Sequence, residues 1–284
     1  MTPLRNRMIQ AMRQRRLAHS TCQSYLYSVI SLARYTRESP DKLTISDIQR
    51  YFEFLVQEKN LSASSCILQL QAIKFLYVKV LGWPDTDFDI VVPKKPQNIP
   101  DLLTRKQVGE IISQCKNHKH RMMLKVCYGC GLRVGEVVKL RVSNIDGERH
   151  LLKVVQAKGK KDRMVIVGPH LLVSLRQYWS SERPQNWLFP SNSRDHHLCA
   201  GSLQRVYRAA KQKAGVDKDG GIHGLRHAYA THQLAAGMSI VDLQHQMGHA
   251  SIMTTMRYLH WVPDYRTQNK RGADLLAQLE DEQS

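Results

Sequence analysis

Residues 150–167, HLLKVVQAKGKKDRMVIV, contain the clearest β pattern in a chain whose other regular segments repeat with a helical period. The β-branched residues within 150–156 and 163–167 favour strands, and the polar AKGKKD between them (157–162) is typical of a turn. The stretch therefore predicts a β-hairpin. Because helical patterns lie on both sides of it, we expect a mainly α fold with a small antiparallel β-sheet.

The region before the hairpin is divided by a proline-rich stretch. Pro93, Pro96 and Pro100 lie within VVPKKPQNIPDLL (91–103) and prevent a continuous helix there. We expect a linker between two domains, which suits a chain of 284 residues. The predicted order is a first domain at 1–90, the linker at 91–103, a second domain at 104–270 and a C-terminal tail at 271–284.

The first domain is predicted to be a small basic bundle of four helices. In the third helix, Ile48, Phe52 and Leu55 recur at i, i+4 and i+7, which gives the helix one apolar face. Ser20 and Gln23 resemble a capping box that would open the second helix. The four expected helices are an arginine-rich one that starts near residue 4, followed by segments near 20–38, 45–59 and 63–81.

The second domain has further helical patterns around the hairpin. Thr104 and Gln107 form another expected capping box, before an amphipathic helix that opens the domain. Gly215, Gly237 and Gly248 stand where helices could end in a left-handed residue. The later helices are expected near 169–179, 202–213, 223–236, 239–247 and 251–260.

The charge of the chain indicates a polyanionic partner. Lysine and arginine number 42 against 24 aspartates and glutamates, a formal charge of +18, which is far more than solubility requires. A basic protein of membrane surfaces would concentrate these residues beside an apolar helix face, whereas here they are spread along the chain. We find no membrane-spanning stretch and no signal-peptide pattern, so we expect a soluble, cytoplasmic protein that binds nucleic acid.

The cysteines and one histidine pair do not have the spacing of metal ligands. Cys127 and Cys130 form a single C-x-x-C without a second pair at zinc-site spacing, so we expect buried, reduced thiols in helix packing. Asp195, His196 and His197 lie in a stretch with turn composition and are interpreted as loop. We predict no metal site.

Two basic stretches of the second domain have the chemistry to bind phosphate. In GLRVGE (131–136), a guanidinium at Arg133 can grip two phosphate oxygens and Glu136 at i+3 can orient it, although a surface ion pair has the same spacing. In the hairpin turn, Lys158 could protonate a leaving oxygen, but a solvated turn or simple contact with a DNA backbone is also typical of such a loop. The same turn holds Lys160, Lys161 and Arg163.

Two further stretches add histidines, a second arginine and a tyrosine. His223 and Arg226 in HGLRH (223–227) are three residues apart, so both side chains point the same way at a helix start. His249 follows a predicted helix end, and Tyr258 lies nine residues later. Two rival tyrosines, Tyr128 and Tyr229, stand within apolar helical patterns and are expected to be core residues.

The ordered set resembles the signature of tyrosine recombinases, the phage integrase family, over essentially the whole chain. The resemblance implies a SAM-like, core-binding helical bundle before a catalytic domain, in a compact two-domain arrangement similar to transposon- or integron-borne integrases and to recombinases that resolve chromosome dimers. The positions that match are Arg133 in GLRVGE, Lys158 in the hairpin, His223 and Arg226 in HGLRH, His249 in GHAS and Tyr258 in TTMRYLH.

The resemblance implies site-specific cutting and rejoining of DNA through a 3′-phosphotyrosyl link on Tyr258. Arg133, Arg226 and His249 would stabilise the phosphate charge, Lys158 would be the general acid and His223 would assist proton movement at the nucleophile. Glu136 would orient Arg133, and no metal ion or other cofactor would be required. The implied partners are a double-stranded recombination site and three further protomers in a synaptic tetramer. The C-terminal tail could dock in trans on a neighbouring protomer or pack on its own domain, and the sequence does not separate the two. DNA contacts are expected from Lys160, Lys161 and Arg163.

Several alternatives remain at this point. A type IB topoisomerase uses the same nucleophile and phosphate clamp, but the small N-terminal helical domain argues against it. A catalytically silent DNA-binding accessory protein would have no need of the complete set of six residues. Integration or excision of a mobile element is the preferred role, with resolution of chromosome or plasmid dimers as the alternative.

Overall fold

The structure is a computed structural model that describes residues 2–84, 90, 93, 101–155, 162–193 and 195–261. The chain divides into two compact units, residues 1–98 and 99–284, and each is described by itself. Most of the predicted linker, the hairpin turn with its three lysines and the C-terminal tail lie outside the described residues. Within the described ranges, no helix combines the length and the hydropathy needed to cross a membrane.

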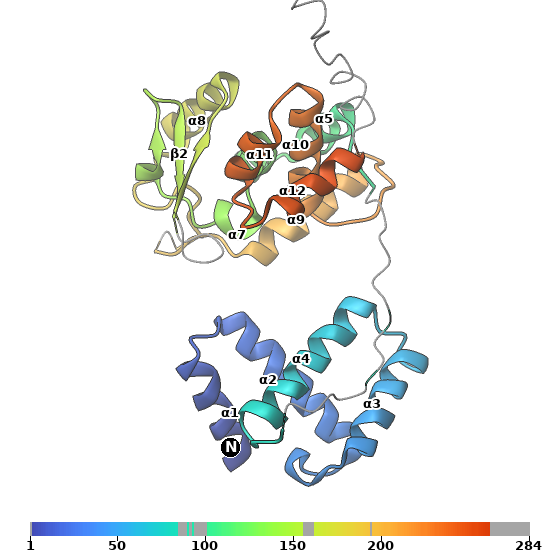
Figure 1. The fold of residues 1–284 in the computed structure, drawn as a ribbon. Coiled ribbons are helices and arrows are strands. Elements are labelled where there is room, and N and C mark those ends of the chain that lie inside the picture. The colour runs from blue at the N-terminus through green and yellow to red at the C-terminus, as the bar shows by residue number, and fades with distance from the viewer. Residues whose placement is uncertain are drawn as a thin grey trace, which may run out of the picture. The chain divides into compact units, whose positions relative to one another are not determined.

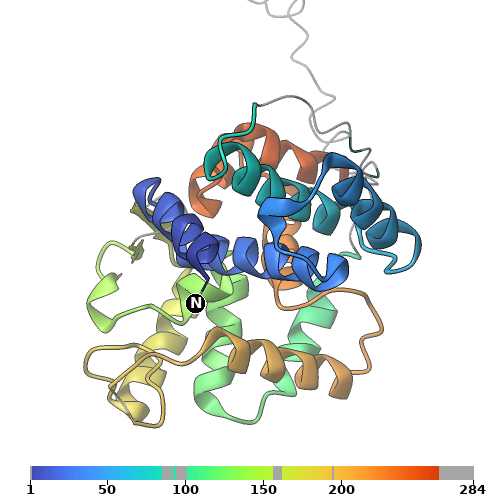
Figure 2. The ribbon, with the colours of Figure 1, turned by 90° about the horizontal axis from the view of Figure 1, so that it is seen from below.

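The N-terminal unit is a helical bundle. α2 and α4 pack together, with α1 against α2 and α3 against both (Figures 1 and 2). The elements are α1 (Pro3–Gln14), α2 (His19–Thr36), the 3-10 turn η1 (Pro40–Lys42), α3 (Ile45–Gln57) and α4 (Ala63–Lys79).

The apolar faces of these helices meet in one core. Ile48, Phe52 and Leu55, which the sequence places on one face of α3, are all buried against residues of the other helices. The predicted capping box at Ser20 is wrong, because α2 already begins at His19 and its N-cap, Ala18, has no side chain that could accept a hydrogen bond. Helical periodicity located the helix, but the signal for its first residue was weak.

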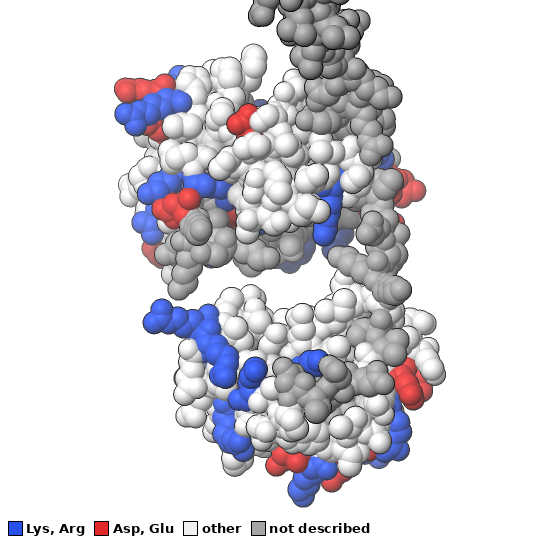
Figure 3. All heavy atoms as spheres, viewed as in Figure 1, with Lys and Arg blue, Asp and Glu red and all other residues white. Residues whose placement is uncertain are grey.

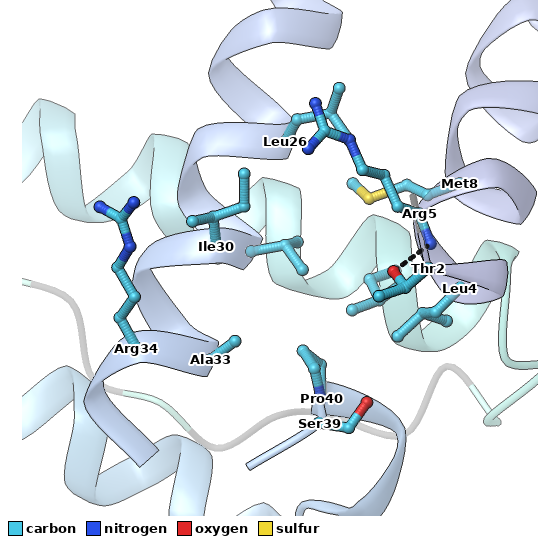
Figure 4. A pocket seen from close by; sticks show the side chains of 12 residues that line it. Thr2, Leu4, Arg5, Met8, Leu26, Ile30, Ala33, Arg34, Ser39 and Pro40 are labelled. Atoms are coloured by element: carbon cyan, nitrogen blue, oxygen red, sulfur yellow. Dashed lines mark hydrogen bonds between the residues drawn. The ribbon is translucent and has the colours of Figure 1, made fainter. Parts of the chain in front are cut away.

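A pocket of about 520 Å³ opens in this unit beside α1 and α2 (Figure 4). The apolar side chains of Met8, Leu26 and Ile30 line it, and the side chains of Arg5 and Arg34 belong to its lining as well. None of the residues that the sequence singles out for chemistry lines this pocket. Those residues all belong to the C-terminal unit.

The C-terminal unit is helical with one small sheet. In Figure 1 the sheet lies beside α8, and α10, α11 and α12 lie next to one another. The helices are α5 (Arg105–Ser113), α6 (His118–Gly129), α7 (Val134–Val137), η2 (Val142–Asn144), α8 (Pro169–Glu182), α9 (Ala200–Lys213), α10 (His223–Ala235), α11 (Ile240–Met247), α12 (Ile252–Met256) and η3 (Arg257–Trp261).

The sheet is antiparallel in the order β1 (Ile145–Asp146), β2 (Leu151–Val154) and β3 (Arg163–Ile166). The register pairs Leu152 with Val165, and both side chains are buried. The predicted hairpin is confirmed as β2 and β3, and so is the mainly α fold class. β1 was not predicted, because a two-residue strand is too short to show an alternating pattern.

The predicted helix ends of this unit are largely confirmed. Thr104 and Gln107 form the expected capping box at α5. Gly215, Gly237 and Gly248 all have positive φ, as left-handed residues at helix ends do. The helix expected at 251–260 is divided instead, with five residues of α12 followed by the 3-10 turn η3.

Candidate active site

A tight turn between α6 and α7 places the first arginine. Gly131 has φ +60°, and a Cβ built there would come within 2.3 Å of the Tyr229 ring, so only glycine fits this turn. Two residues later, Arg133 is the N-cap of α7. The GLRVGE stretch thus fixes the backbone from which the Arg133 side chain extends.

Glu136 joins two arginines beneath the site. Its carboxylate accepts hydrogen bonds from Nη1 of Arg133, from the Arg133 backbone N–H and from both terminal nitrogens of Arg163, all at 2.9 Å. Burial alone would raise the pKa of Glu136, but the bonds from Arg163 and Arg133 outweigh it and lower the pKa to about 2. The carboxylate is therefore ionised and orients Arg133 at neutral pH.

Arg163 has a different place from the one that the sequence suggested. Its side chain is only 11% exposed, with its guanidinium paired to Glu136 and its Nε donating to the Gln246 carbonyl at 3.0 Å. The sequence suggested that Arg163 contacts DNA, whereas in this structure its nitrogens are engaged inside the protein. The basic turn made it look like its neighbours Lys160 and Lys161, which lie outside the described residues.

Arg226 is the deepest of the arginines. It is 1% exposed in α10, and it donates to the carbonyls of Gly131 and Met247 at 2.6 Å each. Burial and the nearby Arg133 lower its pKa to about 10, so it keeps its charge at neutral pH. These bonds join α10 to the turn before α7 and to the end of α11.

His249 lies directly against Arg226. Nη2 of Arg226 donates to Nε2 of His249 at 3.0 Å, and Nδ1 of His249 lies 2.9 Å from the hydroxyl oxygen of the buried Thr255. Because an arginine can only donate, Nε2 accepts and the ring proton lies on Nδ1. Burial, together with Arg226 and Arg133, lowers the pKa of His249 to about 4, which agrees with a neutral ring.

Tyr258 extends into the same site from η3. It is 4% exposed, its ring lies parallel to that of His249 with 6.3 Å between the centroids, and Trp261 packs edge-on against it. Its hydroxyl lies 2.9 Å from Nδ1 of His227. Burial raises the pKa of Tyr258, while the charges of Arg226 and Arg133 act in the opposite direction.

The first histidine of HGLRH does not make this contact. His223 begins α10 and its ring meets the His227 ring edge-on at 4.6 Å. Burial and the charges of Arg226 and Arg133 lower the pKa of His223. His227 was not singled out from the sequence, although its spacing carried a signal, because i and i+4 lie on one face of a helix.

The structure joins most of the predicted set in one place. Arg133, Arg226, His249 and Tyr258 meet there, with Glu136 behind Arg133. Lys158 lies outside the described residues, so its position is not described. Among the described residues, no group of three or more His, Cys, Asp and Glu side chains is arranged to hold a metal ion.

The rival candidates have structural roles. Tyr229 is buried and packs on Gly131, and Tyr128 shares a hydrogen bond with Nδ1 of His232 at 2.9 Å. Cys127 and Cys130 are buried free thiols whose pKa values are raised by burial. The prediction that these residues serve packing is confirmed.

A tyrosine hydroxyl beside two arginines and two histidines, on a mainly helical unit that follows a smaller helical bundle, defines an enzyme that transfers a phosphoryl group to tyrosine. Comparison with known proteins gives the family. Residues 101–263 match the Phage integrase family and residues 4–85 match the phage integrase N-terminal SAM-like domain. The chain belongs to the phage integrase family and is a tyrosine recombinase, as the sequence predicted.

Named relatives and solved structures agree with this. A protein of Sinorhizobium fredii named integrase/recombinase is 36% identical over 91% of this chain and 84% of its own length. Tyrosine recombinase XerA of Thermococcus kodakarensis is 30% identical over 91% of both chains. The crystal structure of XerA recombinase matches with a TM-score of 0.56 at 28% identity, covering 95% of this chain and 98% of that one. The Tn1549 transposon integrase has the same fold, with a TM-score of 0.72 at 18% identity over 100% of this chain and 99% of that one.

Proposed function

We propose that this recombinase cuts and rejoins DNA at a specific site through Tyr258, and that it serves the integration or excision of a mobile element. The observation that carries the proposal is the place of Tyr258, whose ring stacks on that of His249 while the charge of the Arg226 guanidinium, bonded to His249, acts on its hydroxyl. A buried tyrosine has no structural need of such charges, whereas an attack on a phosphodiester requires them.

The phosphate would bind between the two arginines. Arg226 is held in a fixed orientation by the Gly131 and Met247 carbonyls, and Arg133 by Glu136. The Nη2 of Arg133 makes a long contact, 3.4 Å to the Gly248 carbonyl, so it can turn to a non-bridging oxygen at little cost. Preorganised donors of this kind stabilise the charge that develops in the transition state.

His249 would add a hydrogen bond to the phosphate once its protonation changes. In the free protein its Nε2 accepts from Arg226, so it has no proton to donate there. A bound phosphate would compensate the charges of Arg226 and Arg133 that lower the pKa of His249. Nε2 would then be protonated and donate to a phosphate oxygen.

The remaining predicted residues complete the reaction. Lys158 would protonate the departing 5′-oxygen, His223 would assist proton movement near the nucleophile, and Lys160 and Lys161 would bind the DNA backbone. The tyrosyl link conserves the energy of the broken bond, and the arginines supply the charge. The reaction as proposed therefore uses neither a metal ion nor a nucleotide cofactor.

Double-stranded DNA is the proposed partner. The formal charge of +18 supports it, and Figure 3 shows lysine and arginine side chains on the visible surface of both units. Solved relatives of this fold include XerH bound to difH DNA and a lambda integrase dimer bound to a core site. We propose that the protein acts as a tetramer on two DNA duplexes and that it is located in the cytoplasm. The proposed domain order is a helical DNA-binding domain at 1–90, a linker at 91–103, a catalytic domain at 104–270 and a tail at 271–284. The exposed arginines of α1 and of the turn that follows it would face a phosphate backbone; they are Arg5, Arg7, Arg13, Arg15 and Arg16.

A second role, resolution of chromosome or plasmid dimers, fits the same chemistry. It is favoured by relatives named XerA, just as the mobile-element role is favoured by the integrase/recombinase and transposon integrase matches. The two roles differ in the DNA that is cut rather than in any residue of the site.

Covalent trapping tests the proposal. The protein is incubated with nicked DNA from the sequence that flanks its own gene, denatured and examined for DNA-linked protein. We expect an adduct that Tyr258→Phe does not form, and sequencing of its 3′ end gives the cleavage site. Tight, salt-sensitive binding without any adduct would instead indicate a DNA-binding accessory protein.

A further inference from the structure

The nucleophile is paired with a histidine that the predicted catalytic set does not contain. The Tyr258 hydroxyl and Nδ1 of His227 are 2.9 Å apart, a distance at which a proton can be passed directly. His223, which the resemblance assigns to proton movement, contacts the ring of His227 rather than the tyrosine hydroxyl. His227, rather than His223, is therefore the histidine that contacts the Tyr258 hydroxyl.

The surroundings of His227 keep it neutral in the free protein. His223 lies on its own helix at 4.6 Å, Trp261 packs edge-on from η3 at 5.9 Å, and the charged neighbour is Arg226. Burial and the charges of His223 and Arg226 lower the pKa of His227 to about 4. With its proton on Nε2, the ring presents a lone pair on Nδ1 to the Tyr258 hydroxyl.

We propose that His227 is a further catalytic residue, whose Nδ1 takes the proton of the Tyr258 hydroxyl during DNA cleavage and returns it during rejoining. The step rests on the proposed function. The tyrosine oxygen bonds to phosphorus as its proton passes to Nδ1, and the bond from phosphorus to the 5′-oxygen breaks as Lys158 protonates that oxygen. The reverse step restores the Tyr258 hydroxyl, so protons and bonds balance over a round of recombination.

Binding of DNA would make His227 a stronger base before Tyr258 attacks the phosphate. The charges that oppose its protonation are those of Arg226 and of His223 when protonated. A phosphodiester bound to Arg226 brings a negative charge that offsets them. His227 is thus a weak base while the site is empty and takes a proton more readily once DNA is bound.

The first test compares two histidines of α10 that make the same kind of bond. Nδ1 of His227 and Nδ1 of His232 each lie 2.9 Å from a tyrosine hydroxyl, Tyr258 and Tyr128 respectively. Formation of the covalent complex on the nicked DNA from the trapping experiment is measured in single turnover between pH 6 and pH 10. We expect His227→Asn to slow it by about 100-fold or more at pH 7, with a rate that keeps rising with pH, and His232→Asn to stay within about threefold of the unmodified protein.

A second measurement separates the two ends of the reaction. DNA with sulfur in place of the bridging 5′-oxygen has a leaving group that needs no proton. Its cleavage should be restored in Lys158→Ala but not in His227→Asn, because the latter defect is at the nucleophile. Thermal melting and salt-dependent DNA binding show that each variant is folded, and His227→Gln takes the place of His227→Asn if the latter does not fold.

Different results would overturn the two proposals. His227→Asn that cleaves within about threefold of the unmodified protein with the same pH profile would remove His227 from the mechanism. Full recovery of this variant on the sulfur-containing DNA would place His227 at the leaving group and overturn the proposal that it takes the proton of Tyr258. The proposed function itself would be overturned by either of two results. The adduct could persist in Tyr258→Phe, or the unmodified protein could form no adduct.

Discussion

Glu136 shows at the level of a single residue how the site is held together. Its carboxylate lies between the guanidinium groups of Arg133 and Arg163 and has a side-chain exposure of only 8%. Removing the charge would leave both arginines near each other without a counterion, which is costly where water has little access. The contribution of this residue should therefore be visible in stability as well as in catalysis.

We predict that Glu136→Gln lowers the free energy of unfolding by about 3 kcal/mol at pH 7. This magnitude follows from a pKa lowered from 4.5 to about 2. Because the folded-state pKa is the lower one, the stabilisation is complete above pH 4.5 and is lost as the pH falls towards 2. Urea denaturation of the unmodified protein and of Glu136→Gln between pH 2.5 and pH 8 measures this. Their free energies of unfolding should differ at neutral pH and become equal at the acid end of the range. An equal effect of Glu148→Gln, at an exposed position, would contradict this explanation.

Arg163 allows a test between contact with DNA and positioning of Arg133. We expect Arg163→Gln to slow covalent complex formation at least about tenfold, because Glu136 loses one of its two partners. The slope of the logarithm of the binding constant against the logarithm of salt concentration should not change, whereas each lost phosphate contact would reduce it by about one. Lys160→Gln is the matched control, for which we expect that reduction. A reduced slope in Arg163→Gln would support the contact with DNA that the sequence suggested.

At the level of elements, the sequence was sufficient wherever a pattern repeats along one segment. Helical periodicity, the capping box at Thr104 and the glycine at the end of α11 located helices because each signal is local. The two-residue β1 and the change from α12 to η3 depend on packing between segments. No local pattern announces them.

The site divides in the same way. Arg133, Arg226, His249 and Tyr258 were predicted from short motifs in order along the chain, and the structure brings them together. Arg163 bonds to Glu136, which lies 27 positions earlier in the chain. Tyr258 bonds to His227, which lies 31 positions earlier. Such pairings are set by the approach of α7 to β3 and of η3 to α10, so the sequence alone did not reveal them.

The turn after α6 gives a prediction for two glycines. We expect Gly131→Ala to lower the free energy of unfolding by about 2 to 4 kcal/mol, because φ is +60° and the new Cβ would meet the Tyr229 ring. Gly109, within α5, has open space around it, and Gly109→Ala should raise stability by about 1 kcal/mol. Denaturation at pH 7 measures both, and a Gly131→Ala protein as stable as the original would show that the turn accepts another conformation.

At the scale of the whole molecule, recombination requires several protomers, so the question arises which protomer supplies the nucleophile. In this chain Tyr258 bonds to His227 and lies parallel to His249, and the same chain contributes Arg226. The tyrosine thus reaches the arginines without crossing to a neighbour. We therefore predict that each protomer of the proposed assembly cleaves the strand bound in its own site.

Mixing two inactive variants tests cleavage within one protomer. Tyr258→Phe lacks the proposed nucleophile, and Arg226→Lys loses the fixed pair of hydrogen bonds to the Gly131 and Met247 carbonyls that orients its charge. If each site uses its own tyrosine, every protomer in the mixture still lacks one essential group. The mixture should then form no more covalent complex on nicked DNA than either variant alone. If tyrosine is exchanged between protomers, a site with intact Arg226 can receive an intact tyrosine from its neighbour. DNA would then be attached to the Arg226→Lys chain after mixing. That result would refute cleavage within one protomer.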